Sequence, residues 1–276
     1  MEWHLNIPKI LHVYWGGNKL PYIRYMTVRS FINHNPDWDV MFWYSEHPTP
    51  VDTSLYSAPD INSYSNYLPE LMKLNIKKNV VDVEEYGFNN DMSEIHKSDF
   101  IRYQILSTIG GVWADMDIIF IKPITQLVVN SIMNKDKETF ISISGYGHSI
   151  GFLMGCSENN FFKTITSLSK GSYNKKVSQC IGSLMLNHYY PTLESVNRIS
   201  PAVNIDMEAV YPYNVNNVED ILGNNLRITE SSVGVHWYGG HPMWKNFIKN
   251  TDGGSMNLPN SIISNIIKQE SSYEGI

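Results

Sequence analysis

The fold is decided by residues 93–121, which read SEIHKSDFIRYQILSTIGGVWADMDIIFI. The first half of this stretch predicts a helix, because apolar residues recur at the spacing of one helical face. Ser93 suits the N-cap position before Glu94, and Gly110-Gly111 ends the helical pattern. Residues 112–121 then predict a turn and a strand.

Two carboxylates lie in this segment at the end of a predicted strand, at Asp115 and Asp117. Alternate side chains of an extended backbone share a face, so both carboxylates are expected to point the same way. Neighbouring carboxylates repel each other unless a cation lies between them. Mn2+ and Mg2+ prefer such oxygen ligands together with substrate phosphates. The spacing alone does not discriminate, because Asp37 and Asp39 share it and are interpreted as a solvated turn before a strand.

The preceding helix carries charges in unusual places. Arg102 falls inside its apolar stripe, and Asp99 lies at the edge of that stripe. An unpaired charge there is costly, so we expect an internal partner or a ligand. The alternative is an i,i+3 Asp–Arg pair that only stabilises the helix. The double glycine allows a tight turn, which places Asp115 and Asp117 near this helix.

Outward from this stretch, the chain opens as an α/β protein. Residues 7–15 predict a strand that stops at Gly16-Gly17, residues 22–33 a helix, and residues 39–44 a second strand. Strand, helix and strand with a glycine turn after the first strand is typical of a nucleotide-binding sheet. Further predictions are a surface excursion over 49–66, strands at 140–144, 152–156 and 233–238, and a terminal loop and short helix over 250–276.

Composition limits the function classes. The 276 residues are 42% apolar and show neither a repeat nor a linker, which predicts a single domain over residues 1–276. A formal charge of -6 argues against nucleic acid and anionic membranes as partners. Only two cysteines, no signal peptide and no apolar run near the ~20 residues of a membrane span predict a cytoplasmic protein without a transmembrane segment.

Several motifs in a fixed order carry a family resemblance. The chain resembles glycosyltransferases whose sugar-binding region contains an Asp-x-Asp motif, among them initiating α-mannosyltransferases, lactosylceramide galactosyltransferases and bacterial capsular polysaccharide enzymes. It is also similar to the glucosylating domain of large clostridial toxins. The match extends to about Pro123 and rests on the following residues: Ile7-Pro8-Lys9-Ile10, His12, Trp15, Gly16-Gly17, Asn35-Pro36-Asp37-Trp38, Trp43, Ser98-Asp99-Phe100-Ile101-Arg102, Leu106, Gly110-Gly111-Val112-Trp113 and Asp115-Met116-Asp117.

This resemblance implies a GT-A fold, a Rossmann-like α/β domain with a mixed central sheet flanked by helices. Residues 1–125 would form the nucleotide-sugar-binding half and residues 126–276 the acceptor-binding half. The resemblance also implies a divalent metal, Mn2+ or Mg2+, and a retaining reaction.

The family's functional residues transfer to matching positions of this chain. Trp15 would stack on the nucleotide base. Asp99 and Arg102 would hydrogen-bond the hydroxyls of the donor sugar. Asp115 would contact ribose and sugar and reach the metal through water, and Asp117 would coordinate the metal directly. Asp99, Arg102, Asp115 and Asp117 are therefore the candidate catalytic residues.

The C-terminal half departs from the family pattern. Gly182-Ser183 is the nearest counterpart of a Gly-Pro pair in relatives, and His236 stands where relatives have a His followed by Ser-Trp. His236 is a candidate metal or diphosphate contact, with a satisfied structural histidine as the alternative.

The expected function is metal-dependent, retaining transfer of a hexose or N-acetylhexosamine from a UDP- or GDP-sugar to a glycan or glycoconjugate acceptor. Two alternatives stay open: toxin-like glycosylation of a protein, and a non-catalytic module that binds sugar nucleotides. A phosphohydrolase with Asp115 as nucleophile is disfavoured. Such enzymes place the motif after an apolar strand with Thr or Val two residues on, and here Ile119 follows.

Overall fold

The computed structural model describes residues 3, 5–49, 64–128, 136–250 and 258–273. Within these ranges a seven-stranded sheet has the order β3-β2-β1-β4-β7-β6-β8, and β5 and β9 form a separate two-stranded sheet. The strands are β1 (Ile10–Tyr14), β2 (Asp39–Ser45), β3 (Lys77–Val81), β4 (Gly111–Ala114), β5 (Ile118–Phe120), β6 (Thr139–Ser144), β7 (Gly147–Gly155), β8 (Ala202–Asn204) and β9 (Gly234–His236).

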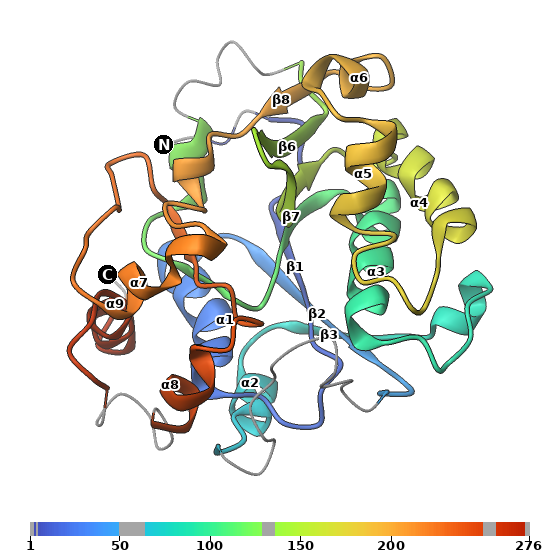
Figure 1. The fold of residues 1–276 in the computed structure, drawn as a ribbon. Coiled ribbons are helices and arrows are strands. Elements are labelled where there is room, and N and C mark those ends of the chain that lie inside the picture. The colour runs from blue at the N-terminus through green and yellow to red at the C-terminus, as the bar shows by residue number, and fades with distance from the viewer. Residues whose placement is uncertain (1–2, 4, 50–63, 129–135, 251–257, 274–276) are drawn as a thin grey trace.

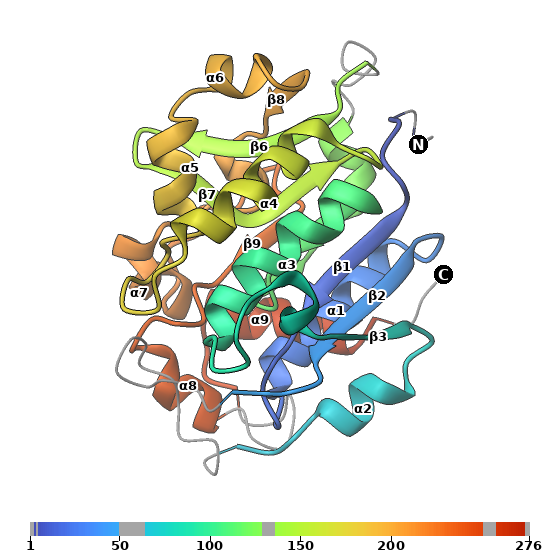
Figure 2. The ribbon, with the colours of Figure 1, turned by 90° about the vertical axis from the view of Figure 1, so that its right-hand side faces the viewer.

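Helices cover both faces of the large sheet, as the two ribbon views show (Figures 1 and 2). On one side lie α3, α4 and α5, and on the other lie α1 and α9. The helices are α1 (Tyr22–His34), α2 (Leu68–Lys73), α3 (Glu94–Thr108), α4 (Asn160–Ser172), α5 (Ser183–Tyr189), α6 (Leu193–Asn197), α7 (Val218–Leu222), α8 (Trp244–Asn250) and α9 (Ile262–Ser271). None of the helices in the described ranges combines the length and apolar character needed to cross a membrane.

The large sheet is mixed. The strands β3, β2, β1 and β4 run parallel, whereas β7 runs antiparallel to both β4 and β6. The predicted strand–helix–strand opening is confirmed as β1, α1 and β2. The carboxyl ends of parallel strands are where such sheets bind ligands.

The double glycine after α3 is held in place by a buried histidine. Gly110 has φ 71° and Gly111 φ 106°, which favour glycine. Burial lowers the pKa of His12 to about 4, although the hydrogen bond to the Gly110 carbonyl acts to raise that pKa. The ring is therefore neutral at pH 7. It donates from Nε2 to the Gly110 carbonyl at 2.9 Å and accepts at Nδ1 from Trp43 Nε1 at 3.1 Å.

The prediction of a turn and a strand over residues 112–121 is confirmed in part. Two strands are present, because β4 ends at Ala114 and β5 begins at Ile118, and Asp115 and Asp117 lie in the turn that follows the end of β4. The Ile118 N–H closes this turn on the Asp115 carbonyl at 3.2 Å. Whereas β4 pairs with β7 in the large sheet, β5 pairs with β9 and does not continue that sheet. The same-face argument for the two carboxylates therefore fails, and the turn brings them together.

The remaining predictions fared unevenly. Strands β6, β7 and β9 were expected, although β7 begins five residues earlier than the predicted 152–156, and α9 fills part of the predicted terminal segment. The polar edge strand β3 and the three-residue β8 were missed, because neither shows an apolar alternation. Most of the predicted surface excursion, residues 50–63, lies outside the described residues.

Candidate functional site

Strand pairing brings three candidate metal ligands together. Asp115 and Asp117 stand between β4 and β5, and His236 ends β9, where it pairs with Ile118. A ligand atom from each of Asp115, Asp117 and His236 lies within 4.8 Å of the others. His236 Nε2 is 3.1 Å from Asp117 Oδ1. The sequence suggested these residues separately, and the β5–β9 sheet joins them.

This cluster fits a divalent cation chemically. Asp117 Oδ2 accepts the Gly239 N–H at 2.8 Å, but Oδ1, although buried, receives no hydrogen bond of regular geometry from the described residues. Burial alone would raise the pKa of Asp117, yet His236, with Arg24 and the Gly239 N–H, holds that pKa below its usual value. Two carboxylates and an imidazole suit Mn2+, which accepts oxygen and nitrogen ligands.

A buried guanidinium links α3 to the same cluster. Arg102 Nη2 lies 2.9 Å from Asp99 Oδ1, and Nη1 lies 3.2 Å from Asp115 Oδ1. Nη1 also donates to the Ile150 carbonyl at 2.7 Å, and the guanidinium lies over the Trp113 ring at 5.3 Å. Burial disfavours this charge, but the two carboxylates outweigh it and raise the pKa of Arg102. The expected internal partner is present, and the pair is more than a helix-stabilising i,i+3 contact.

Asp99 keeps one carboxylate oxygen available. Its Oδ2 is buried and has no hydrogen-bond partner in the part of the chain that the structure describes. Burial raises the pKa of Asp99 to about 7, although Arg102 acts to lower it. A Cβ added at Gly182 would lie 2.6 Å from this oxygen and 2.6 Å from Gln179 Oε1. Gly182 is therefore needed to leave room beside this buried acceptor.

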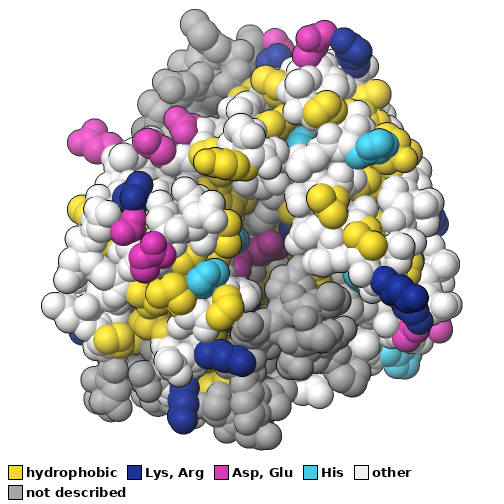
Figure 3. Space-filling model, in the orientation of Figure 1, with side chains coloured by type: hydrophobic (Ala, Val, Ile, Leu, Met, Phe, Trp, Pro, Cys, Tyr) yellow, Lys and Arg dark blue, Asp and Glu magenta, His cyan; other side chains and the backbone are white. Residues whose placement is uncertain are grey.

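Trp15 borders a cavity at the carboxyl ends of β1 and β2. The cavity measures about 240 Å³, and the indole N–H of Trp15 donates to the Lys19 carbonyl at 2.9 Å. Figure 3 shows a hollow in the middle of the visible face, with acidic side chains at its floor. Described residues that line the cavity are Trp15, Gly16, Gly17, Asn18, Phe42, Tyr44, Ser45, Glu46, Pro48, Leu68 and Met72.

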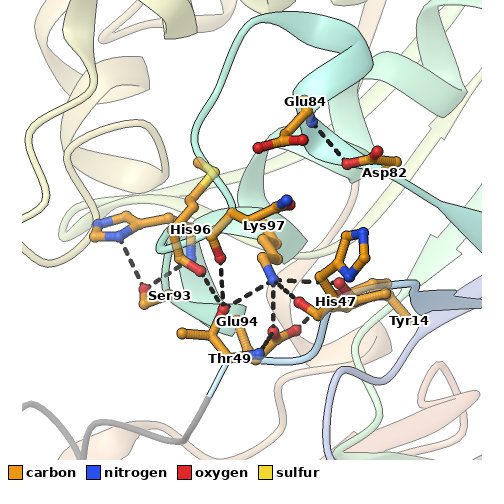
Figure 4. A network of polar contacts seen from close by, with 12 residues as sticks. Tyr14, His47, Thr49, Asp82, Glu84, Ser93, Glu94, His96 and Lys97 are labelled. Atoms are coloured by element: carbon orange, nitrogen blue, oxygen red, sulfur yellow. Dashed lines mark hydrogen bonds and ion pairs between the residues drawn. The ribbon is translucent and has the colours of Figure 1, made fainter.

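A buried ionic network fixes one wall of this cavity to α3 (Figure 4). The wholly buried Lys97 ammonium lies 2.9 Å from Glu94 Oε1 and donates to the His47 carbonyl at 2.6 Å and to Thr49 Oγ1 at 2.8 Å. Glu94 in turn accepts the Thr49 N–H at 2.6 Å and the Tyr14 hydroxyl at 2.5 Å. The segment 45–49 that lines the cavity is thus tied to the helix that carries Asp99 and Arg102.

Replacing Lys97 by methionine is expected to lower the free energy of unfolding by about 2 kcal/mol. Glu94 would lose its cation but keep the Thr49 N–H and the Tyr14 hydroxyl, so the loss should stay moderate. Urea unfolding measures the change, with the exposed Lys175→Met as the matched control. Equal stability of the two variants would show that the network does not hold segment 45–49.

Sequence reasoning missed two parts of the site. Tyr211 is buried against the cluster, with its ring centroid 5.1 Å from that of His236. Its hydroxyl has no hydrogen-bond partner among the described residues. No motif surrounds Tyr211, so no local signal could have found it. The second missed part is the pair of Glu94 and Lys97, whose i,i+3 spacing on a helix could have indicated an ion pair.

The second Asp-x-Asp of the chain is exposed and lies away from the site. Its Asp37 pairs with Lys9, and its Asp39 pairs with Lys77.

Part of the chain is similar to a known protein family. Residues 24–138 match the family described as glycosyltransferase sugar-binding region containing DXD motif. Inositol phosphoceramide mannosyltransferase 1 of Schizosaccharomyces pombe is 28% identical over 170 residues, which cover 59% of this chain and 43% of that protein. The matched region therefore spans less than half of this relative.

Two solved structures are similar over almost the whole chain. Glycosyltransferase GlyE of Streptococcus pneumoniae TIGR4 has a TM-score of 0.54 at 12% identity, covering 97% of this chain and 61% of that one. The galactosyltransferase LgtC, solved with donor and acceptor sugar analogs, has a TM-score of 0.50 at 14% identity, covering 97% of each chain. These likenesses confirm the predicted GT-A fold with its mixed central sheet.

Proposed function

Because residues 24–138 match the glycosyltransferase sugar-binding region that contains a DXD motif, we propose that the chain is a metal-dependent, retaining glycosyltransferase. It moves a hexose or N-acetylhexosamine from a UDP- or GDP-sugar to a glycan acceptor. Residues 1–125 form the donor half and residues 126–276 the acceptor half. The observation that carries this proposal is the convergence of Asp115, Asp117 and His236 beside the buried Asp99–Arg102 pair.

In this proposal each candidate residue has a role that its surroundings support. Trp15 stacks on the base in the cavity that it borders. Asp99 accepts a hydrogen bond from a hydroxyl of the donor sugar at its free Oδ2. Arg102 holds the carboxylates of Asp99 and Asp115 in position through its ion pairs with both. A divalent ion held by Asp117, His236 and Asp115 would offset the charge that develops on the leaving diphosphate.

The sugar would pass through an oxocarbenium-like state while an acceptor hydroxyl attacks from the face that the diphosphate leaves. This same-face course rests on the family resemblance. The mannosyltransferase relative supports including mannose among the donor sugars and inositol phosphoceramide among the acceptors to be tested. A cytoplasmic location stays a prediction.

Donor hydrolysis without an acceptor tests the proposal. The purified protein is incubated with a panel of UDP- and GDP-sugars, with Mn2+ or with EDTA, and released nucleotide is measured. We expect release from one donor that requires the metal. Binding of UDP or GDP without release from any donor, even with candidate acceptors, would support the non-catalytic alternative. If the protein neither releases nucleotide from any donor nor binds UDP or GDP, the proposal as a whole is contradicted.

A further inference from the structure

Arg24 lies between the cavity and the cluster of Asp117 and His236, at a place that we call the joint. It lies in the first turn of α1, and its guanidinium carbon is 4.9 Å from the centroid of the Trp15 ring and 5.1 Å from that of the Trp237 ring. Trp15 borders the cavity, whereas Trp237 directly follows His236. The guanidinium is thus held between two indole rings that belong to different parts of the site.

The guanidinium also reaches the segment that positions Asp117. A Cβ added at Gly239 would lie 2.5 Å from Arg24 Nη2, and it is the Gly239 N–H that binds Asp117 Oδ2. The guanidinium therefore lies beside the backbone segment that binds Asp117.

Within the described ranges, the guanidinium of Arg24 forms neither a hydrogen bond nor an ion pair, and only its backbone N–H donates, to the Pro21 carbonyl at 3.0 Å. The other buried cations differ, since Arg102 and Lys97 are both satisfied by carboxylates and carbonyls of the protein. The first turn of α1 contains no acidic residue, so the positive end of the helix dipole adds to the guanidinium charge. A partly buried guanidinium that donates to none of the described residues is arranged to bind an anion.

We propose that Arg24 binds the diphosphate of the donor, between the nucleoside in the Trp15-lined cavity and the metal ligands Asp117 and His236. This assignment rests on the proposed function. In a sugar nucleotide the diphosphate connects the nucleoside to the sugar, so it must cross the joint where Arg24 lies. A guanidinium presents paired N–H groups that match phosphate oxygens, and contact with two indole rings restricts where this group can lie.

Charge balance supports the same assignment. The carboxylates of Asp115 and Asp117 would balance the charge of one bound divalent ion, and Arg102 is engaged by Asp99 and Asp115. The negative charge of the diphosphate itself therefore needs another cation. Arg24 supplies a fixed one that does not depend on metal occupancy.

The test compares a nucleoside diphosphate with its nucleoside. Calorimetry first establishes whether the unaltered chain binds UDP or GDP, and the one that binds is then used with uridine or guanosine, in EDTA and in Mn2+. Arg24→Met keeps an unbranched apolar chain between the rings. We expect it to weaken diphosphate binding about tenfold to a hundredfold in both buffers while nucleoside binding stays within about twofold. Arg24→Lys should recover part of the loss, because it restores the charge without the planar fork.

The matched control is Arg29→Met, which removes the same charge from α1 five residues further along, on another side of the helix. It should leave both affinities unchanged. An equal loss of diphosphate and nucleoside binding in Arg24→Met would overturn the assignment, because Arg24 would then only support Trp15. No loss of either would also overturn it. Failure of the unaltered chain to bind UDP and GDP would instead contradict the proposed function.

Discussion

Donor hydrolysis by the Asp117→Asn variant is expected to fall by roughly three orders of magnitude. The substitution preserves the size of the side chain and an oxygen that can accept the Gly239 N–H, but it removes the negative charge next to His236. If Asp117 binds the metal as proposed, loss of this charge weakens metal binding, and stabilisation of a leaving diphosphate by a metal is worth several kcal/mol. Nucleotide release at saturating donor and Mn2+ measures the effect.

The chain contains its own control for this substitution. Asp37 belongs to an Asp-x-Asp of the same spacing, but it is exposed and paired with Lys9. Asp37→Asn should leave hydrolysis unchanged. Mn2+ binding followed by electron paramagnetic resonance provides a second readout, weakened by Asp117→Asn and unaffected by Asp37→Asn. Undiminished Mn2+ binding and hydrolysis in the Asp117→Asn variant would contradict the assignment of Asp117 as a metal ligand.

The sequence predicted best where burial of a charge forces a consequence. Arg102 within an apolar stripe required a partner, and the structure provides Asp99, Asp115 and the Ile150 carbonyl. Only Asp99 could have been named as the partner from local spacing. The Ile150 carbonyl lies 48 residues away and is brought in by β7.

Sequence reasoning failed where the site depends on long-range pairing. The turn at Asp115–Asp117 contains neither Gly nor Pro, and β-forming residues flank it, so an extended backbone was expected at the two carboxylates. The placement of His236 beside Asp117 follows from β5–β9 pairing, which no local pattern specifies. The position of Arg24 in the site could not be predicted for the same reason. It depends on contacts with Trp15 and Trp237, which are far apart in the sequence.

The conformation of the double glycine leads to a prediction about stability. Gly110→Ala is expected to lower the free energy of unfolding by about 4 kcal/mol or more. A left-handed φ of 71° disfavours any side chain, and the new Cβ would lie 2.5 Å from Cys156 C and 2.5 Å from Ser157 N. These are backbone atoms of the segment after β7, so relief of the clash would have to move the chain that borders β4.

Urea unfolding of Gly110→Ala is best read against Gly171→Ala, the same substitution near the end of α4. A Cβ at Gly171 would meet nothing within 4 Å among the described residues, and alanine favours a helix. That variant should gain about 0.5–1 kcal/mol. A loss of less than about 1 kcal/mol in Gly110→Ala would mean that the turn tolerates a side chain. The turn after α3 would then not be what fixes the position of Asp115 relative to Arg102, and the β4–β7 pairing would have to do so alone.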